Sequence, residues 1–96
     1  MTGEGRVKEA VKKLLKEHGA YYHMPVQNGM GKPSLDFIGA HSGWFFGIET
    51  KAGKGVPTPR QELTIKEMQA AGGQCFVVNE VSGLPELESW LKWVSE

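Results

Sequence analysis

Two apolar segments separated by a tight turn constrain the fold of this chain most strongly. Residues 35–40 and 44–51 are rich in aromatic and β-branched side chains, and the residues between them read His-Ser-Gly. Short runs of this kind, separated by turn-forming residues, are typical of a β-hairpin. Charged residues stand inside both segments, and charged side chains are rarely buried unless they are paired or bind a metal. The hairpin is therefore predicted to carry a functional site.

The remaining segments alternate between helical and strand patterns. Residues 4–18 have apolar side chains at helical spacing, and a second helix is predicted from Thr58, as N-cap, to about Ala71, with Pro59 in its first turn. Strands are expected at 20–24 and 74–79, and a last helix at about 85–94. The predicted order is α-β-β-β-α-β-α. This order describes one α/β domain over residues 1–96, with a central mixed β-sheet flanked by helices.

The charged residues of the hairpin have the chemistry of a divalent-metal site. Alternate strand residues face the same way, so Glu49 and Lys51 share a face, and a neighbouring strand carrying Asp36 brings a second carboxylate. Mg²⁺ and Mn²⁺ prefer such oxygen ligands, and the backbone carbonyl of Thr50 is a third candidate. The alternative is a salt bridge from Lys51 to one carboxylate. Because that alternative leaves the other carboxylate without a partner, we favour the metal site.

Two further side chains are candidates for the same site. Glu4 lies on the apolar stripe of the first helix, whereas Glu9 projects outward, so Glu4 is preferred; its other interpretation is a favourable interaction with the helix N-terminus. Gln61 completes a capping box with Thr58, which is a structural role. Gln61 also shares a helical face with Ile65, so its amide is expected to reach the sheet beside Lys51. Both interpretations of Gln61 stay open.

Composition narrows the class of protein. The 96 residues carry no net charge, but nine of the eleven Lys and Arg residues lie in positions 1–60, where Lys32, Lys54 and Arg60 occupy loops suited to phosphate contacts. A single cysteine excludes a disulfide framework. The sequence shows neither a membrane-length apolar run nor an apolar secretory segment at its N-terminus. A cytoplasmic location is expected, which is the host cytoplasm if the source is viral.

The pattern Glu4…Asp36…Glu49-Thr50-Lys51…Gln61 resembles the PD-(D/E)XK nuclease superfamily, and within it the VRR-NUC family of virus-type replication and repair nucleases. The resemblance covers essentially the whole chain and implies a restriction-endonuclease-like core. That family usually has a proline directly before the aspartate, whereas Leu35 stands there in this chain and Pro33 lies three residues before Asp36. Asp36 is therefore assigned from its strand context.

The resemblance also implies an activity. Asp36 and Glu49 would bind Mg²⁺ or Mn²⁺, Lys51 would serve the attacking water, and Glu4 and Gln61 would complete the catalytic site. The expected protein is a phage or bacterial DNA-repair endonuclease similar to Holliday-junction resolvases, a homodimer that hydrolyses phosphodiester bonds of branched DNA with metal-activated water. The alternatives are a monomeric flap or nicking nuclease and a non-catalytic DNA-binding module of the same fold.

Overall fold

The structure is a computed structural model that describes residues 2–27, 29 and 31–96. The elements follow one another as α1 (Gly3–Glu17), β1 (Tyr21–His23), β2 (Phe37–His41), β3 (Trp44–Thr50), α2 (Pro59–Ala70), β4 (Gln74–Val78) and α3 (Leu84–Val94). The predicted order is confirmed, and the predicted ends lie within two residues of these bounds. None of the helices in the described part of the chain has the length and apolar character to span a membrane.

The four strands form one mixed sheet in the order β1-β2-β3-β4. The first three strands are antiparallel neighbours, and β4 runs parallel to β3. His41 pairs with Trp44, so the turn of the predicted hairpin contains only Ser42 and Gly43, with φ angles of 51° and 84°. Two positive φ angles define the turn type that matches the twist of a hairpin. His41 therefore ends β2 and does not belong to the turn.

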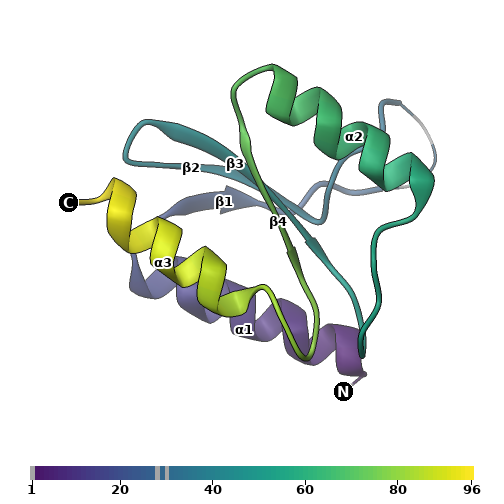
Figure 1. The fold of residues 1–96 in the computed structure, drawn as a ribbon, viewed down its shortest axis with the longest axis horizontal. Helices are drawn as coiled ribbons and strands as arrows, with labels where there is room; N and C mark the ends of the chain where they lie inside the picture. Colours follow the sequence, from purple (N-terminus) through teal and green to yellow (C-terminus); the bar gives the residue numbers. More distant parts are fainter. Residues whose placement is uncertain (1, 28, 30) are drawn as a thin grey trace.

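The apolar core lies on one face of the sheet, where α1 and α3 pack (Figure 1). Phe46 and Ile48 of β3 alternate onto this face, and Phe46 contacts the ring of Trp90 in α3 with 6.0 Å between ring centroids. The buried apolar residues that complete this cluster are Val7, Val11, Leu14, Leu15, Phe37, Val78, Leu87 and Leu91. Leu84 and Val94, which the helical pattern also predicts to be buried, are only half-buried.

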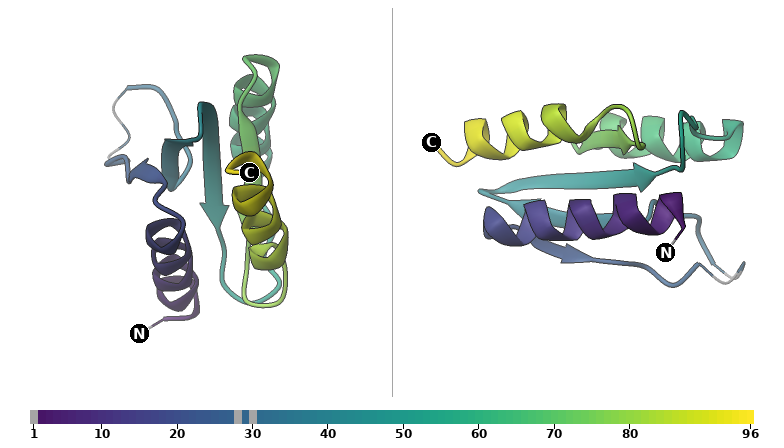
Figure 2. Two further views of the ribbon diagram at one scale, coloured as in Figure 1. Left: turned by 90° about the vertical axis from the view of Figure 1, so that its left-hand side faces the viewer. Right: turned by 90° about the horizontal axis from the view of Figure 1, so that it is seen from below.

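Helix α2 covers the opposite face of the sheet much less completely. Figure 2 shows β3 running between α1 and α2. None of the α2 residues is buried, although Ile65 and Met68 face the sheet. A Cβ at Gly47 of β3 would lie 3.1 Å from the sulfur of Met68, so glycine at this position allows α2 to approach. The end of β3 that carries Glu49 therefore lies under a thinly packed helix.

Candidate active site

Asp36 lies directly before β2, where the β2–β3 ladder ends. One residue further on, Phe37 pairs with Ile48, so Asp36 stands level with Glu49. Its Oδ2 accepts a hydrogen bond from the Thr50 backbone N–H at 2.9 Å and a second from the Thr50 hydroxyl at 2.7 Å. The sequence pattern places Asp36 inside the strand, and this is wrong. The carboxylate takes the N–H that a strand carbonyl would otherwise accept, so the ladder stops before Asp36.

Glu49 is held from two sides through one of its oxygens. The Gln61 amide donates a hydrogen bond to Glu49 Oε2 at 2.7 Å, and the Lys51 ammonium lies 3.5 Å from the same oxygen. The Glu49 side chain is only 3% exposed, and its Oε1 is buried with no hydrogen-bond partner among the described residues. A buried oxygen without a partner loses its hydration and gains nothing in return. Oε1 is therefore free to bind a ligand.

Glu49 titrates at an unusually high pH for a carboxylic acid. The pKa of Glu49 is raised from 4.5 to about 6. Burial is the largest cause and the negative charge of Asp36 adds to it, while Lys51 and the Asp36 backbone N–H act in the opposite direction. Close carboxylates oppose each other's ionisation. The Lys51 ammonium thus compensates the negative charge of Asp36 and Glu49 only in part. A further positive charge would favour the ionised form of Glu49.

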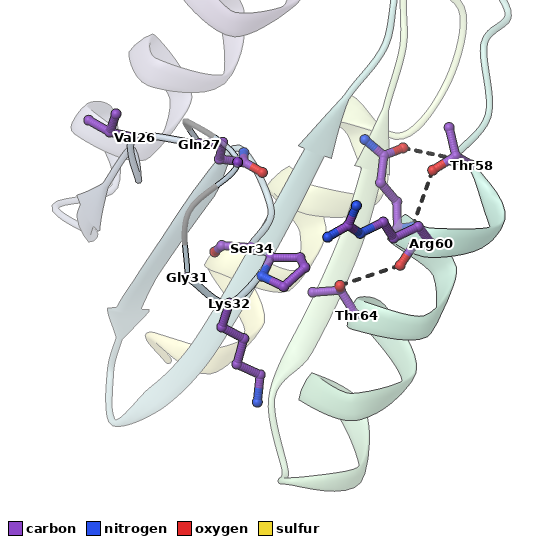
Figure 3. A pocket seen from close by; sticks show the side chains of 11 residues that line it. Val26, Gln27, Gly31, Lys32, Ser34, Thr58, Arg60 and Thr64 are labelled. Carbon is purple, nitrogen blue, oxygen red and sulfur yellow. Dashed lines mark hydrogen bonds between the residues drawn. The ribbon is translucent and has the colours of Figure 1, made fainter.

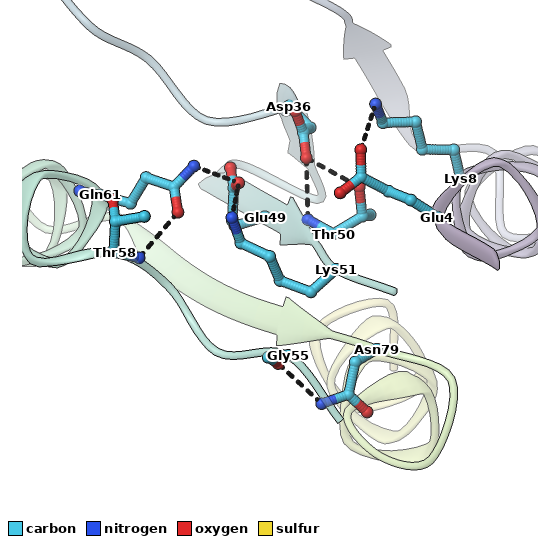
Figure 4. A network of polar contacts seen from close by, with 10 residues as sticks. All are labelled: Glu4, Lys8, Asp36, Glu49, Thr50, Lys51, Gly55, Thr58, Gln61 and Asn79. Atoms are coloured by element: carbon cyan, nitrogen blue, oxygen red, sulfur yellow. Dashed lines mark hydrogen bonds and ion pairs between the residues drawn. The ribbon is translucent and has the colours of Figure 1, made fainter. Parts of the chain in front are cut away.

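Gln61 makes the capping contacts that its position suggests, and its side chain also reaches the sheet. Its backbone N–H donates to the Thr58 hydroxyl, and its Oε1 accepts the Thr58 backbone N–H at 2.9 Å, which completes the capping box of α2. Its Nε2 is still free to donate to Glu49 (Figure 4). The side-chain amide therefore links the first turn of α2 to the buried carboxylate.

Glu4 approaches from α1 and is less firmly placed. Its carboxylate pairs with Lys8 at 3.3 Å, and its side chain is 43% exposed. Figure 4 draws Glu4 on the α1 side of Asp36 and Gln61 on the α2 side of Glu49. Glu9 pairs with Lys12 on the surface, as expected for an outward-facing residue. Glu4 thus makes no hydrogen bond to Asp36 or Glu49 in the described part of the chain, and its contact there is with Lys8.

A groove lies between the loop after β1 and the first turns of α2, and it shares Gln61 with the site (Figure 3). It has a volume of about 260 Å³ and is lined by polar and cationic side chains, among them Lys32, Ser34, Arg60 and Gln61. Gln61 joins the groove to Glu49. Lys32 pairs with Glu67 of α2, and Arg60 is exposed. Lys54 is also exposed, in the loop after β3, and does not line the groove.

The oxygens of this site fit a hard divalent cation. Asp36 and Glu49 each have one oxygen held by protein donors and one without a donor among the described residues. The N–H and C=O of a strand residue point to the same side, so the Thr50 carbonyl also faces Asp36. Over the described residues, no three His, Cys, Asp or Glu side chains cluster closely enough to hold a metal. Protein carboxylates, a carbonyl and substrate oxygens are the usual ligands of Mg²⁺.

The architecture defines an α/β domain of the restriction-endonuclease-like type, with the site at the end of β3. A solved structure described as a VRR_NUC domain has a similar fold, with a TM-score of 0.71 and 18% sequence identity over 99% of this chain and 96% of that one. Neither a protein-family model nor a curated protein matches the sequence. The fold expected from the resemblance to the VRR-NUC family is therefore confirmed.

One contact of the site was not expected from the sequence. The sequence pattern indicates only the backbone carbonyl of Thr50 as a site group, whereas its side chain is completely buried and donates to Asp36. The signal in the sequence is a hydroxyl residue that continues the alternation of Phe46 and Ile48 onto the apolar face, where an apolar residue would pack equally well. The partner of the hydroxyl depends on how far β2 extends, which the sequence does not specify.

Proposed function

We propose that this protein is a metal-dependent DNA endonuclease that hydrolyses phosphodiester bonds at the Asp36–Glu49–Lys51 site. The observation that supports this most strongly is the buried Oε1 of Glu49, which has no partner in the described chain and lies in the field of a second carboxylate. A cation accounts for both features, because it binds the free oxygen and offsets the repulsion between the acids.

Each residue of the site is proposed to have a separate role in hydrolysis. Bound Mg²⁺ or Mn²⁺ supplies Lewis acidity toward the phosphate and lowers the pKa of water. Asp36 and Glu49 would hold the cation, with the Thr50 carbonyl as a third ligand. The Lys51 ammonium lies beside Glu49, where it orients the attacking water and stabilises negative charge on the phosphate. Gln61 holds Glu49 in place, and Glu4 completes the site from α1.

We further propose branched DNA, in particular a four-way junction, as the substrate. Lys32 and Arg60 in the groove, together with Lys54, supply contacts to the DNA backbone, and such contacts read shape and not sequence. Paired incision of a junction requires two catalytic centres, and the described residues of this chain form one such site. The protein is therefore proposed to act as a homodimer, because a two-fold axis places two identical sites on one substrate.

The test is cleavage of a labelled four-way junction and a linear duplex in Mg²⁺, in Mn²⁺ and in EDTA. We expect cutting of the junction with either metal and none in EDTA. Asp36→Asn removes the charge but keeps an acceptor for Thr50, and we expect it to abolish cutting. Glu86→Gln, an exposed acid of α3, is the matched control and should cut normally. Cutting by Asp36→Asn, or in EDTA, contradicts the proposed site.

The finer parts of the proposal have separate readouts. The mass in solution tests the dimer, and the symmetry of the two cuts tests paired incision. A monomer that nicks one strand would indicate the flap or nicking activity instead. Equal rates on junction and linear duplex would contradict selectivity for branched DNA and leave the nuclease site itself intact.

A further inference from the structure

Thr50 lies between Glu49 and Lys51, whose side chains face α2, whereas its own side chain lies on the other face of the sheet. It is completely buried, on the face that also carries Phe46 and Ile48. A buried hydroxyl is costly unless it has a hydrogen-bond partner. Valine has nearly the same shape and requires no partner. The hydroxyl at this position therefore needs an explanation other than packing.

The hydroxyl donates to Asp36 in a short, well-defined contact. Its oxygen lies 2.7 Å from Asp36 Oδ2, and the backbone N–H of the same residue lies 2.9 Å from the same oxygen. Hydrogen bonds to an ionised acceptor are shorter and stronger than neutral ones. A hydroxyl has one hydrogen to donate, and here it is directed at the carboxylate. Both donors of Thr50 thus hold a single oxygen of Asp36.

Because both oxygens belong to one carboxylate, donors that hold Oδ2 of Asp36 also fix the direction of Oδ1. Asp36 is half-exposed and directly precedes β2, so strand pairing alone does not fix its side chain. Two donors on Oδ2 restrict rotation of the carboxylate, and the only other oxygen, Oδ1, is without a donor among the described residues. Glu49 repeats this arrangement, with Gln61 and Lys51 at Oε2 and Oε1 left free.

We infer that the Thr50 side chain is a positioning residue, whose hydroxyl orients Asp36 so that Oδ1 faces the divalent cation. This inference rests on the proposed metal site and assigns to it a residue that acts through Asp36 without touching the metal. Groups that orient the ligands of a metal typically change its affinity by 10–100-fold when they are removed. The site is then organised from both faces of the sheet, by Thr50 from one side and by Gln61 from the other.

The experiment compares Mn²⁺ binding by the wild type, Thr50→Val and Thr50→Ser, measured from the electron paramagnetic resonance signal of the free ion. Valine keeps the shape and removes the hydroxyl, while serine keeps the hydroxyl. We expect Thr50→Val to bind Mn²⁺ at least about tenfold more weakly, and Thr50→Ser to stay within about threefold of the wild type. In an Asp36→Asn background, Thr50→Val should cause no further loss.

The outcomes separate the inference from the proposed function. Wild-type binding that does not depend on Asp36 overturns the metal site itself. If Mn²⁺ binding depends on Asp36 but is unchanged in Thr50→Val, only the role of Thr50 is overturned. The same conclusion follows if Thr50→Ser binds Mn²⁺ as weakly as Thr50→Val. Circular dichroism in EDTA reports whether each variant is folded. If Thr50→Val does not fold, the comparison of Thr50→Ala with Thr50→Ser decides the same question.

Discussion

The two faces of the sheet differ in what they contribute to this protein. The face under α1 and α3 is filled by completely buried apolar side chains, such as Phe46 and Leu91. The face under α2 has no buried residue from its helix, and its most buried charged group is Glu49. A close-packed apolar face supplies stability, whereas the face under α2 holds a buried carboxylate, one oxygen of which has no hydrogen-bond partner among the described residues. Stability and chemistry are thus placed on opposite sides of β3.

The largest expected effect tests the apolar face. Leu91→Ala removes a completely buried side chain from α3 and should lower the free energy of unfolding by about 2–5 kcal/mol. The matched change on the other face, Leu63→Ala in α2, concerns a side chain that is 68% exposed and should cost less than about 0.5 kcal/mol. Urea denaturation of both variants measures the difference. Equal losses would remove the contrast between the faces.

The second-largest expected effect concerns the face of the sheet under α2, which carries Glu49 and Lys51. Lys51→Ala removes the ammonium beside Glu49 and should lower the rate of junction cleavage by about 100-fold or more, because a positioned charge is lost. Lys92→Ala, on the exposed side of α3, is the control and should leave the rate within twofold. Single-turnover rates under saturating Mg²⁺ make the comparison. A cleavage rate for Lys51→Ala equal to that of the control would exclude Lys51 from catalysis.

A third prediction concerns pH and the buried carboxylate. The pKa of Glu49 is raised from 4.5 to about 6, so the folded state binds this proton more tightly than the unfolded state. The associated stabilisation is complete below pH 4.5 and is lost as the pH rises through 6. The loss amounts to about 2 kcal/mol from the size of the shift.

Denaturation in EDTA across pH 4–8 isolates this contribution when the wild type is compared with Glu49→Gln. The difference in unfolding free energy between the two proteins should change in favour of the variant between pH 4.5 and 6.5, and stay level above that range. A difference that does not depend on pH would mean that Glu49 titrates as an ordinary surface acid.

The smallest expected effect concerns the N-caps of α1 and α2, the helices that pack on opposite faces of the sheet. Thr58 caps α2, and Thr2 caps α1 by accepting the Gly5 N–H. Replacing either threonine with alanine should cost about 1 kcal/mol of stability. Only Thr58→Ala should also reduce cleavage, because the Thr58 hydroxyl accepts the Gln61 backbone N–H and so fixes the turn from which the Gln61 amide reaches Glu49. Thermal unfolding and cleavage assays of the two variants test this; equal activity would confine Thr58 to a structural role.

Much of the fold follows from local patterns in the chain. The spacing of apolar residues predicts α1 and α3, and the Thr58-Pro59 start with Gln61 predicts the capping box of α2, because these features depend on residues within one or two helical turns. The assignment of Glu49 and Lys51 to one face of β3 was equally accessible, since alternation is a property of any strand.

Other features depend on neighbours that are remote in the chain. The sequence pattern starts the second strand before Asp36, whereas β2 begins only after that residue, because the Asp36 carboxylate accepts both donors of Thr50, fourteen positions away. The half-burial of Leu84 and Val94 likewise depends on which elements pack against α3. Periodicity shows which side of a helix is apolar, and it does not show how much of that side the fold covers.

Residue types and their spacing are enough to identify the carboxylates, the ammonium and the amide that are able to form the site. Which of the carboxylate oxygens remain free depends on the packing of the folded domain. Gln61 occupies Oε2 of Glu49 and Thr50 occupies Oδ2 of Asp36 only because α2 and the end of β3 bring them there. A hydrogen bond depends on positions accurate to fractions of an ångström, and those positions are set by the packing of the whole domain.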